Sequence, residues 1–144
     1  MGVVTKKSDV FREIQETFGL VPEWLTGMPE TALGSFWGLM RDFYLAETKI
    51  PNKYKELIGI AVSGATRCKY CQLFHTEGAR LQGATDDEIA EAATMAGVTM
   101  MGSTYLNALA VDYDKFAQET TEIVKFVRAQ QAKQAPRRET QPRV

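Results

Sequence analysis

Apolar residues recur every three or four positions along most of this chain, which is the spacing of one face of an α-helix. No stretch shows the alternation of apolar and polar residues that is typical of a half-buried strand. We therefore predict an all-α fold of about six helices. The length of 144 residues suits one domain. We expect a single helical domain over residues 1–133 and a disordered tail over residues 134–144, where the apolar periodicity ends.

Caps, glycines and prolines predict where the helices begin and end. The expected helices cover 9–18, Pro29 to Tyr44, 52–66, the cysteines to a stop at Gly83, and Thr85 to a stop at Gly97. After Gly97 the pattern predicts one long helix to about Lys133, or two helices with a break near 112–114. Residues 20–29 hold two prolines and a glycine and are expected to form a connection. The 52–66 helix is nearly without charge at its centre, so we expect it to be buried on most sides.

Charge and hydropathy exclude several classes of protein. Seventeen Lys and Arg against eighteen Asp and Glu give a net charge of −1, so no strong field attracts nucleic acid or an anionic membrane. No apolar run approaches the ~18 residues that a membrane span needs. The first residues lack the apolar segment of a secretory signal. We therefore expect a cytoplasmic protein with neither nucleic-acid nor membrane partners.

Both cysteines and the only histidine of the chain lie close together, at Cys68, Cys71 and His75. On a helix these three positions share one face. The first turn of a helix stabilises a thiolate through its free N–H groups and its positive dipole end. One helical turn also lets two cysteines close a disulfide with modest adjustment. In a cytosolic chain this spacing indicates redox chemistry or metal binding.

Glu56 precedes Cys68 by 12 residues and begins the least polar of the expected helices. Small residues on its face, Gly59 among them, let the cysteine helix approach closely. A buried carboxylate beside an imidazole can serve as the base that deprotonates a thiol. Taken alone, Glu56 fits a solvated residue and His75 a packed core residue. The position of the only histidine on the cysteine face favours a joint role.

The pattern Glu56-x11-Cys68-x2-Cys71-x3-His75 on an all-α chain of this length resembles the alkylhydroperoxidase D-like branch of the carboxymuconolactone decarboxylase-like superfamily. The resemblance covers residues 51–97. It implies a helical bundle that assembles as a homotrimer or hexamer. It also implies a thiol peroxidase that reduces hydroperoxides without a cofactor and is restored by a thiol or dithiol reductant, either a protein or a small molecule.

The resemblance also assigns roles to single residues. Cys71 matches the cysteine that attacks the peroxide, Cys68 matches the resolving cysteine, and Glu56 and His75 match the proton relay. The best characterised members carry a second histidine where this chain has Tyr70, so the relay is shorter here or uses the phenol. The decarboxylase branch lacks the cysteine pair, which argues against decarboxylation of a lactone.

Two other interpretations stay open. A zinc-binding module would use the two cysteines, His75 and Glu56 as ligands. A structural oligomer without catalysis would use the aromatic stripe of the Pro29 to Tyr44 helix as an interface. Met95, Met100 and Met101 would belong to the same apolar surfaces.

Overall fold

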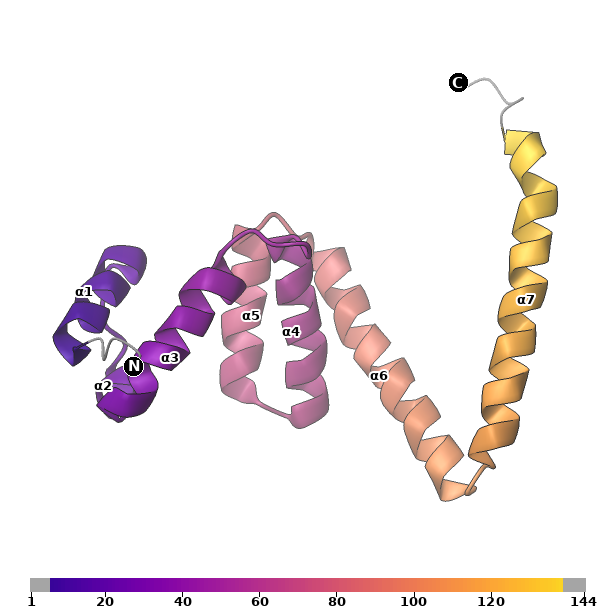
Figure 1. The fold of residues 1–144 in the computed structure, drawn as a ribbon, viewed down its shortest axis with the longest axis horizontal. Coiled ribbons are helices and arrows are strands. Elements are labelled where there is room, and N and C mark those ends of the chain that lie inside the picture. Colours follow the sequence, from indigo (N-terminus) through magenta and orange to yellow (C-terminus); the bar gives the residue numbers. More distant parts are fainter. Residues whose placement is uncertain (1–5, 139–144) are drawn as a thin grey trace, which may run out of the picture. The chain divides into compact units, whose positions relative to one another are not determined.

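The computed structural model describes the backbone of residues 6–138 and the side chains of residues 6–133. The described residues form helices and no strand, so the predicted all-α fold is confirmed (Figure 1). In chain order the helices are α1 (Lys7–Phe18), α2 (Glu23–Thr26), α3 (Glu30–Leu39), the π-helix η1 (Met40–Leu45), α4 (Asn52–Thr66), α5 (Lys69–Leu81), α6 (Asp86–Ala108) and α7 (Tyr113–Arg138). The chain divides into two compact units, residues 1–98 and residues 99–144. In the described part of the chain, no helix combines the length and the hydropathy needed to cross a membrane.

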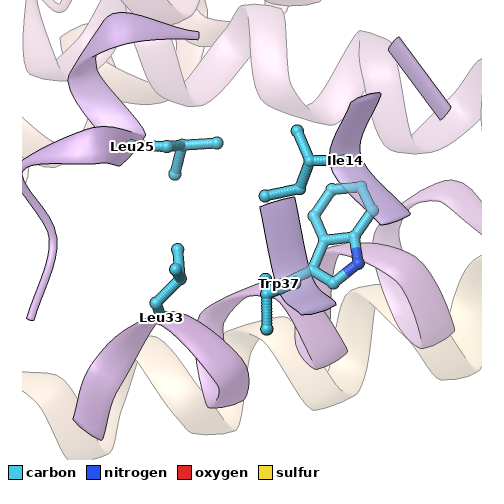
Figure 2. Close-up of a cluster of buried hydrophobic side chains, with 5 residues drawn as sticks. Ile14, Leu25, Leu33 and Trp37 are labelled. Carbon is cyan, nitrogen blue, oxygen red and sulfur yellow. The ribbon is translucent and has the colours of Figure 1, made fainter. Parts of the chain in front are cut away.

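The first hydrophobic core joins α1, α2 and α3. Its buried residues are Val10, Ile14, Leu25, Leu33 and Trp37. Figure 2 shows four of these side chains converging from the three helices. The Trp37 indole N–H donates a hydrogen bond to Glu13 Oε2 (2.9 Å), so the one polar atom of the buried ring is paired. This core anchors the helix that leads to the candidate site.

Within residues 20–29 the structure contains the single-turn helix α2, so the expectation of a plain connection is wrong there. Leu25 of this turn is 1 % exposed and packs in the first core. Lys7 Nζ donates hydrogen bonds to the carbonyl oxygens of Thr26 (2.6 Å) and Met28 (3.2 Å). Packing and these bonds hold a turn that is too short to be stable by itself.

The helix expected from Pro29 to Tyr44 forms as α3, and its last part is the π-helix η1. The wider π turn changes which side chains share a face, and such turns are frequent at functional sites. Residues from the start of α4 bond the carbonyl groups at the end of η1: Asn52 Nδ2 donates to Leu45 O (2.9 Å), and Lys55 Nζ donates to Phe43 O (2.7 Å) and Ala46 O (2.6 Å). The start of α4 thereby fixes the position of η1.

The helices α4 and α5 lie side by side as a hairpin (Figure 1). The predicted helix over 52–66 is confirmed, and so is a helix that begins at the cysteines. Arg67 ends α4 in the left-handed conformation (φ 56°), and the Cys68 N–H donates to Ser63 O (3.0 Å). This tight turn lets α5 begin at Lys69, three residues after the end of α4 at Thr66.

A second core lies where α4, α5 and the start of α6 pack together. Ile60, Ala79 and Ala84 are buried there. The opposite side of α4 is open, since Ile58 is 52 % exposed and Val62 is 55 % exposed. The expectation that this helix is buried on most sides is therefore wrong for the single chain.

The start of α6 has the expected capping box. The Thr85 N–H donates to Glu88 Oε2 (2.9 Å), and the Glu88 N–H donates to Thr85 Oγ1 (3.1 Å). The expected stop at Gly97 is wrong, because α6 continues to Ala108. A glycine inside a helix costs only ~1 kcal/mol relative to alanine, which a long helix tolerates.

The chain turns between Ala108, the end of α6, and Tyr113, the start of α7, so the alternative of two helices is the one confirmed. Asp112 Oδ1 accepts a hydrogen bond from the Lys115 N–H (2.7 Å) and caps α7. The backbone stays helical to Arg138, beyond the point where we expected the tail to begin. Residues 139–144 of the expected tail lie outside the described residues.

Candidate active site

Glu56 is a buried carboxylate on α4, with a side chain that is 8 % exposed. Its two oxygens accept different hydrogen bonds. Oε1 accepts from the Tyr44 hydroxyl (2.5 Å), and Oε2 accepts from His75 Nδ1 (2.8 Å). The predicted neighbourhood of Glu56 and His75 therefore exists, and the carboxylate has the partners that a buried charged group needs.

His75 lies on α5 with a side chain that is 21 % exposed. Because a carboxylate only accepts hydrogen bonds, the contact with Glu56 assigns the ring proton to Nδ1. The neutral ring then carries its lone pair on Nε2. An imidazole that is oriented by a carboxylate in this way is the usual arrangement of a base beside a nucleophile.

Two glycines make room for this pair. A Cβ atom on Gly78 of α5 would lie 2.7 Å from Glu56 Cδ, and a Cβ on Gly59 of α4 would overlap the His75 ring. Any larger residue at either position would displace the Glu56 or the His75 side chain. The sequence pattern indicated Gly59 as a small residue on the Glu56 face but missed Gly78. The available signal for Gly78 was its position three residues after His75, on the same face of the helix.

Tyr44 is the site residue that the sequence analysis missed, because its position fitted the aromatic stripe of the expected second helix. Its hydroxyl donates to Glu56 and lies 3.3 Å from His75 Nδ1. Burial, and then the hydrogen bond and charge of Glu56, hold the pKa of Tyr44 far above its usual range. The hydroxyl therefore keeps its proton at neutral pH and remains a donor.

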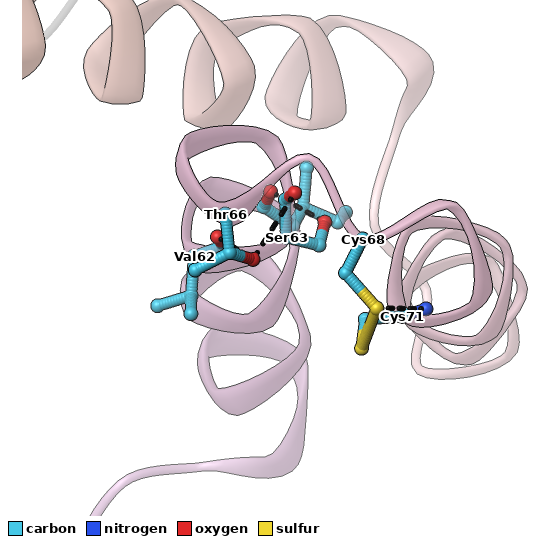
Figure 3. Close-up of a disulfide and its surroundings, with 6 residues drawn as sticks. Val62, Ser63, Thr66, Cys68 and Cys71 are labelled. Carbon is cyan, nitrogen blue, oxygen red and sulfur yellow. Dashed lines mark hydrogen bonds between the residues drawn. A yellow bond between two sulfur atoms is a disulfide. The ribbon is translucent and has the colours of Figure 1, made fainter.

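The two cysteines lie at the start of α5 and are joined by a disulfide (Figure 3). Cys68 is the N-cap residue of this 13-residue helix, and its Sγ accepts a hydrogen bond from the Cys71 N–H (3.2 Å). Cys68 is half-buried, whereas Cys71 is exposed. The positive end of the helix dipole at this point favours a thiolate when the disulfide is reduced.

The four predicted residues form two bonded pairs in the α4–α5 hairpin. Cys68 is paired with Cys71, and Glu56 is paired with His75. Cys71 and His75 are four residues apart on α5 and so share a face. Among the hydrogen bonds of residues 6–133 in this disulfide form, none links the imidazole to a sulfur atom. Tyr70 is 76 % exposed, and the phenol that bonds the relay is that of Tyr44.

The described residues contain no group of three or more His, Cys, Asp and Glu side chains arranged to hold a metal ion. The ligands that the zinc interpretation requires have other partners here. Cys68 and Cys71 bond each other, and His75 bonds Glu56.

An apolar cavity of about 280 Å³ is lined mostly by residues around the first core, and Phe74 of α5 completes its wall. Phe74 precedes His75 on α5, and its ring contacts both the Tyr44 ring (centroids 5.9 Å apart) and the His75 ring (5.7 Å). Glu56, His75 and Tyr44 do not line this cavity.

Comparison with known proteins identifies the family. The family model described as carboxymuconolactone decarboxylase matches residues 29–113, which is more than half of the chain. The chain belongs to the carboxymuconolactone decarboxylase family. The part that matches the family model contains Tyr44, Glu56, both cysteines and His75.

Within the carboxymuconolactone decarboxylase family, the chain has the alkylhydroperoxidase D-like fold. The crystal structure of the alkylhydroperoxidase AhpD core from Rhodospirillum rubrum is similar, with a TM-score of 0.67 and 26 % identity over 77 % of this chain and 85 % of that chain. A crystal structure of a protein from Methanobacterium thermoautotrophicum has a TM-score of 0.54 and 36 % identity over 62 % of this chain and 98 % of that chain.

The chain is also similar to a curated protein of Paracoccus denitrificans that is named "Uncharacterized protein 4 in cox locus". The two sequences are 36 % identical over 63 residues, which is 44 % of this chain. The match spans 57 % of the length of that relative.

Proposed function

We propose that this protein is a thiol-dependent peroxidase in which Cys71 attacks a hydroperoxide and Cys68 resolves the product. One observation carries the proposal: a Cys68–Cys71 disulfide begins the helix whose His75 is bonded to the buried Glu56 carboxylate. The disulfide and the hydrogen-bonded Glu56–His75 pair thus lie on one hairpin, as the proposed reaction requires. The similarity to a protein named alkylhydroperoxidase supports the same chemistry.

In the first step of this reaction, His75 Nε2 takes the proton of the Cys71 thiol, and Glu56 stabilises the imidazolium through Nδ1. The thiolate attacks the distal oxygen of the hydroperoxide, and the O–O bond breaks. Cys71 becomes a sulfenic acid, and the leaving alkoxide takes the proton from His75 to form an alcohol. The exposed position of Cys71 gives a peroxide access to its sulfur.

In the second step, the Cys68 sulfur attacks the sulfenic acid of Cys71 and the oxygen leaves as water, which gives the disulfide. Both electrons come from the cysteine pair, so the cycle needs no cofactor. An external thiol or dithiol, on a protein or a small molecule, then reduces the disulfide by exchange. The cytoplasm, where thiols are kept reduced, is the compartment that suits this cycle.

The same proposal includes assembly as a homotrimer or hexamer. Large apolar side chains are exposed along α6 and α7 in the single chain, for example Met101 (69 %), Ile123 (62 %) and Phe126 (65 %). Monomeric proteins rarely expose so many, and subunit interfaces cover them.

The proposal is tested by measuring the consumption of cumene hydroperoxide with dithiothreitol as the electron donor. We expect turnover by the wild type and none above background by Cys71→Ser. Cys68→Ser should reduce peroxide without forming the intramolecular disulfide. A Cys71→Ser variant as active as the wild type would overturn the assignment. Bound zinc in the active protein, measured by elemental analysis and abolished with activity by chelation, would favour the metal interpretation instead.

A further inference from the structure

We propose that Tyr44 is a positioning residue of the Glu56–His75 relay. Its hydroxyl holds one oxygen of the Glu56 carboxylate and leaves the other oxygen for His75, so that the carboxylate orients the imidazole. The consequence for peroxide reduction rests on the proposed function, whereas the effect on the imidazole does not.

The argument begins with the geometry of three side chains from three elements. The Tyr44 hydroxyl on η1 donates to Glu56 Oε1 (2.5 Å), and Glu56 Oε2 on α4 accepts from His75 Nδ1 (2.8 Å) on α5. Each carboxylate oxygen therefore has its own donor. The Tyr44 and His75 rings also meet edge to face, with centroids 5.9 Å apart. The tyrosine thus restrains both partners of the relay.

The backbone that carries Tyr44 is fixed from α4, the same helix that carries Glu56. Asn52 Nδ2 and Lys55 Nζ bond the carbonyl groups of Leu45 and of Phe43, the residues on either side of Tyr44. The π turn of η1 sets the face on which Tyr44 lies. A rigid support of this kind is what a positioning group requires.

The other charged groups on the helices around His75 bond elsewhere. On α4, Lys53 pairs with Glu88 (2.6 Å), and Lys55 bonds η1 carbonyl groups. On η1, Arg41 pairs with Glu13 and Asp42. On α5, Glu77 pairs with Arg80, Lys69 lies over the Tyr70 ring, and the cysteines form the disulfide. Among the described residues, the polar side chains in contact with the imidazole are Glu56 and Tyr44.

Removing the Tyr44 hydroxyl takes away one of the two donors that hold the Glu56 carboxylate. The carboxylate can then turn about its side-chain torsions, so it orients the His75 ring less well. The imidazole then presents Nε2 to Cys71 in fewer molecules.

The test uses the fact that the chain has one histidine, whose ring nitrogens give a single set of signals in ¹⁵N NMR. The full chain is measured in its disulfide form at mildly alkaline pH, so that no thiol contributes. We expect the wild type to show a proton on Nδ1 in its neutral ring. We expect Tyr44→Phe to show ring signals shifted toward a mixture of the Nδ1–H and Nε2–H forms. Tyr54→Phe, at an exposed tyrosine on α4, is the matched control and should leave the ring signals unchanged.

Unchanged ring signals in Tyr44→Phe would overturn the proposal. Circular dichroism verifies that the variant is folded. In a Glu56→Gln background the Tyr44→Phe effect should vanish, and an effect of full size there would also contradict the proposal.

The reduced protein gives a second readout. Tyr44→Phe should slow hydroperoxide reduction about 10-fold by lowering kcat rather than by raising KM. Changed ring signals in Tyr44→Phe, in a protein that reduces no hydroperoxide, would leave the positioning role standing and reject the proposed function. A protein that reduces hydroperoxide normally, with ring signals that do not change in Tyr44→Phe, would support the proposed function and reject the positioning role.

Discussion

Gly78 of α5 faces Glu56 of α4 so closely that a Cβ atom on the glycine would lie 2.7 Å from Glu56 Cδ. The two helices can therefore enclose a carboxylate between them only because this position has no side chain. The burial of Glu56 and its bond to His75 both depend on that space. The geometry of the candidate site therefore depends on Gly78, through the close packing of α5 against α4.

Gly78→Ala should displace the Glu56 carboxylate and lower the rate of hydroperoxide reduction at least about 10-fold. The free energy of unfolding should change by less than the free energy that corresponds to this loss of rate. Alanine gains ~1 kcal/mol of helix propensity over glycine, which offsets part of the loss of hydrogen bonds. Steady-state kinetics and urea unfolding measure the two effects separately.

Gly64→Ala on α4 is the matched control, because a Cβ atom there would meet nothing within 4 Å. It should retain wild-type activity. Equal activity of Gly78→Ala and Gly64→Ala would mean that the close approach of α5 to Glu56 has no part in catalysis.

Glu56 and His75 should behave as one unit, because Glu56 bonds the imidazole and, in the proposed reaction, acts on Cys71 only through it. Glu56→Gln and His75→Gln should each slow peroxide reduction by ~10²-fold or more, the usual size of general-base help. The double variant should be little slower than either single variant. Rapid-mixing kinetics of the three proteins measures the coupling. Penalties that multiply would show independent roles.

Glu88 links the capping box of α6 to Lys53 of α4, with a contact of 2.6 Å. The hydrogen bond from Lys53, and then that from the Thr85 N–H, lowers the pKa of Glu88 below its ordinary value of 4.5. The contribution of Glu88 to the free energy of unfolding is therefore complete above pH 4.5 and is lost as the pH falls through the lower pKa of the folded state. Urea unfolding of wild type and Glu88→Gln should differ at neutral pH and converge in acid. A difference that persists in acid would contradict this assignment.

Thr85→Ala removes the other half of the same capping box. Loss of the Thr85 Oγ1 acceptor should lower the free energy of unfolding by ~1 kcal/mol, the usual cost of losing an N-cap side chain. Thr94→Ala, an exposed threonine within α6, is the control and should not destabilise the protein. Equal stability of both variants would show that the cap contributes nothing.

The single chain should not exist alone in solution at micromolar concentration. Apolar side chains such as Tyr105 (64 % exposed) and Phe126 (65 %) require a partner surface. Light scattering should therefore give three or six times the chain mass of 16.1 kDa. A mass of 16.1 kDa would contradict the proposed assembly.

Much of the fold was predictable because most helices carry local signals. The Pro51 start of α4 and the Thr85–Glu88 capping box are read from neighbouring residues. The signals failed in two places for different reasons. The turn of α2 exists because Leu25 fits the first core. The 23-residue helix α6 continues past Gly97 because one glycine inside a helix costs only ~1 kcal/mol relative to alanine.

The candidate site shows the same division. The spacing of Cys68, Cys71 and His75 along one helix placed them together, and Glu56 followed from the pattern of the preceding helix. Tyr44 could not be found in this way. Its contact with Glu56 depends on the π turn of η1 and on the packing of η1 against α4. Neither feature can be detected from the spacing of apolar residues.

Mass spectrometry of the reduced protein after limiting hydroperoxide tests the central claim most directly. The wild type should lose two hydrogens as the Cys68–Cys71 disulfide forms. Cys68→Ser should instead carry a sulfenic acid at Cys71 that a 1,3-dione traps, and Cys71→Ser should show neither change. A sulfenic acid that forms first on Cys68, or a reduced wild type that peroxide leaves unchanged, would contradict the account.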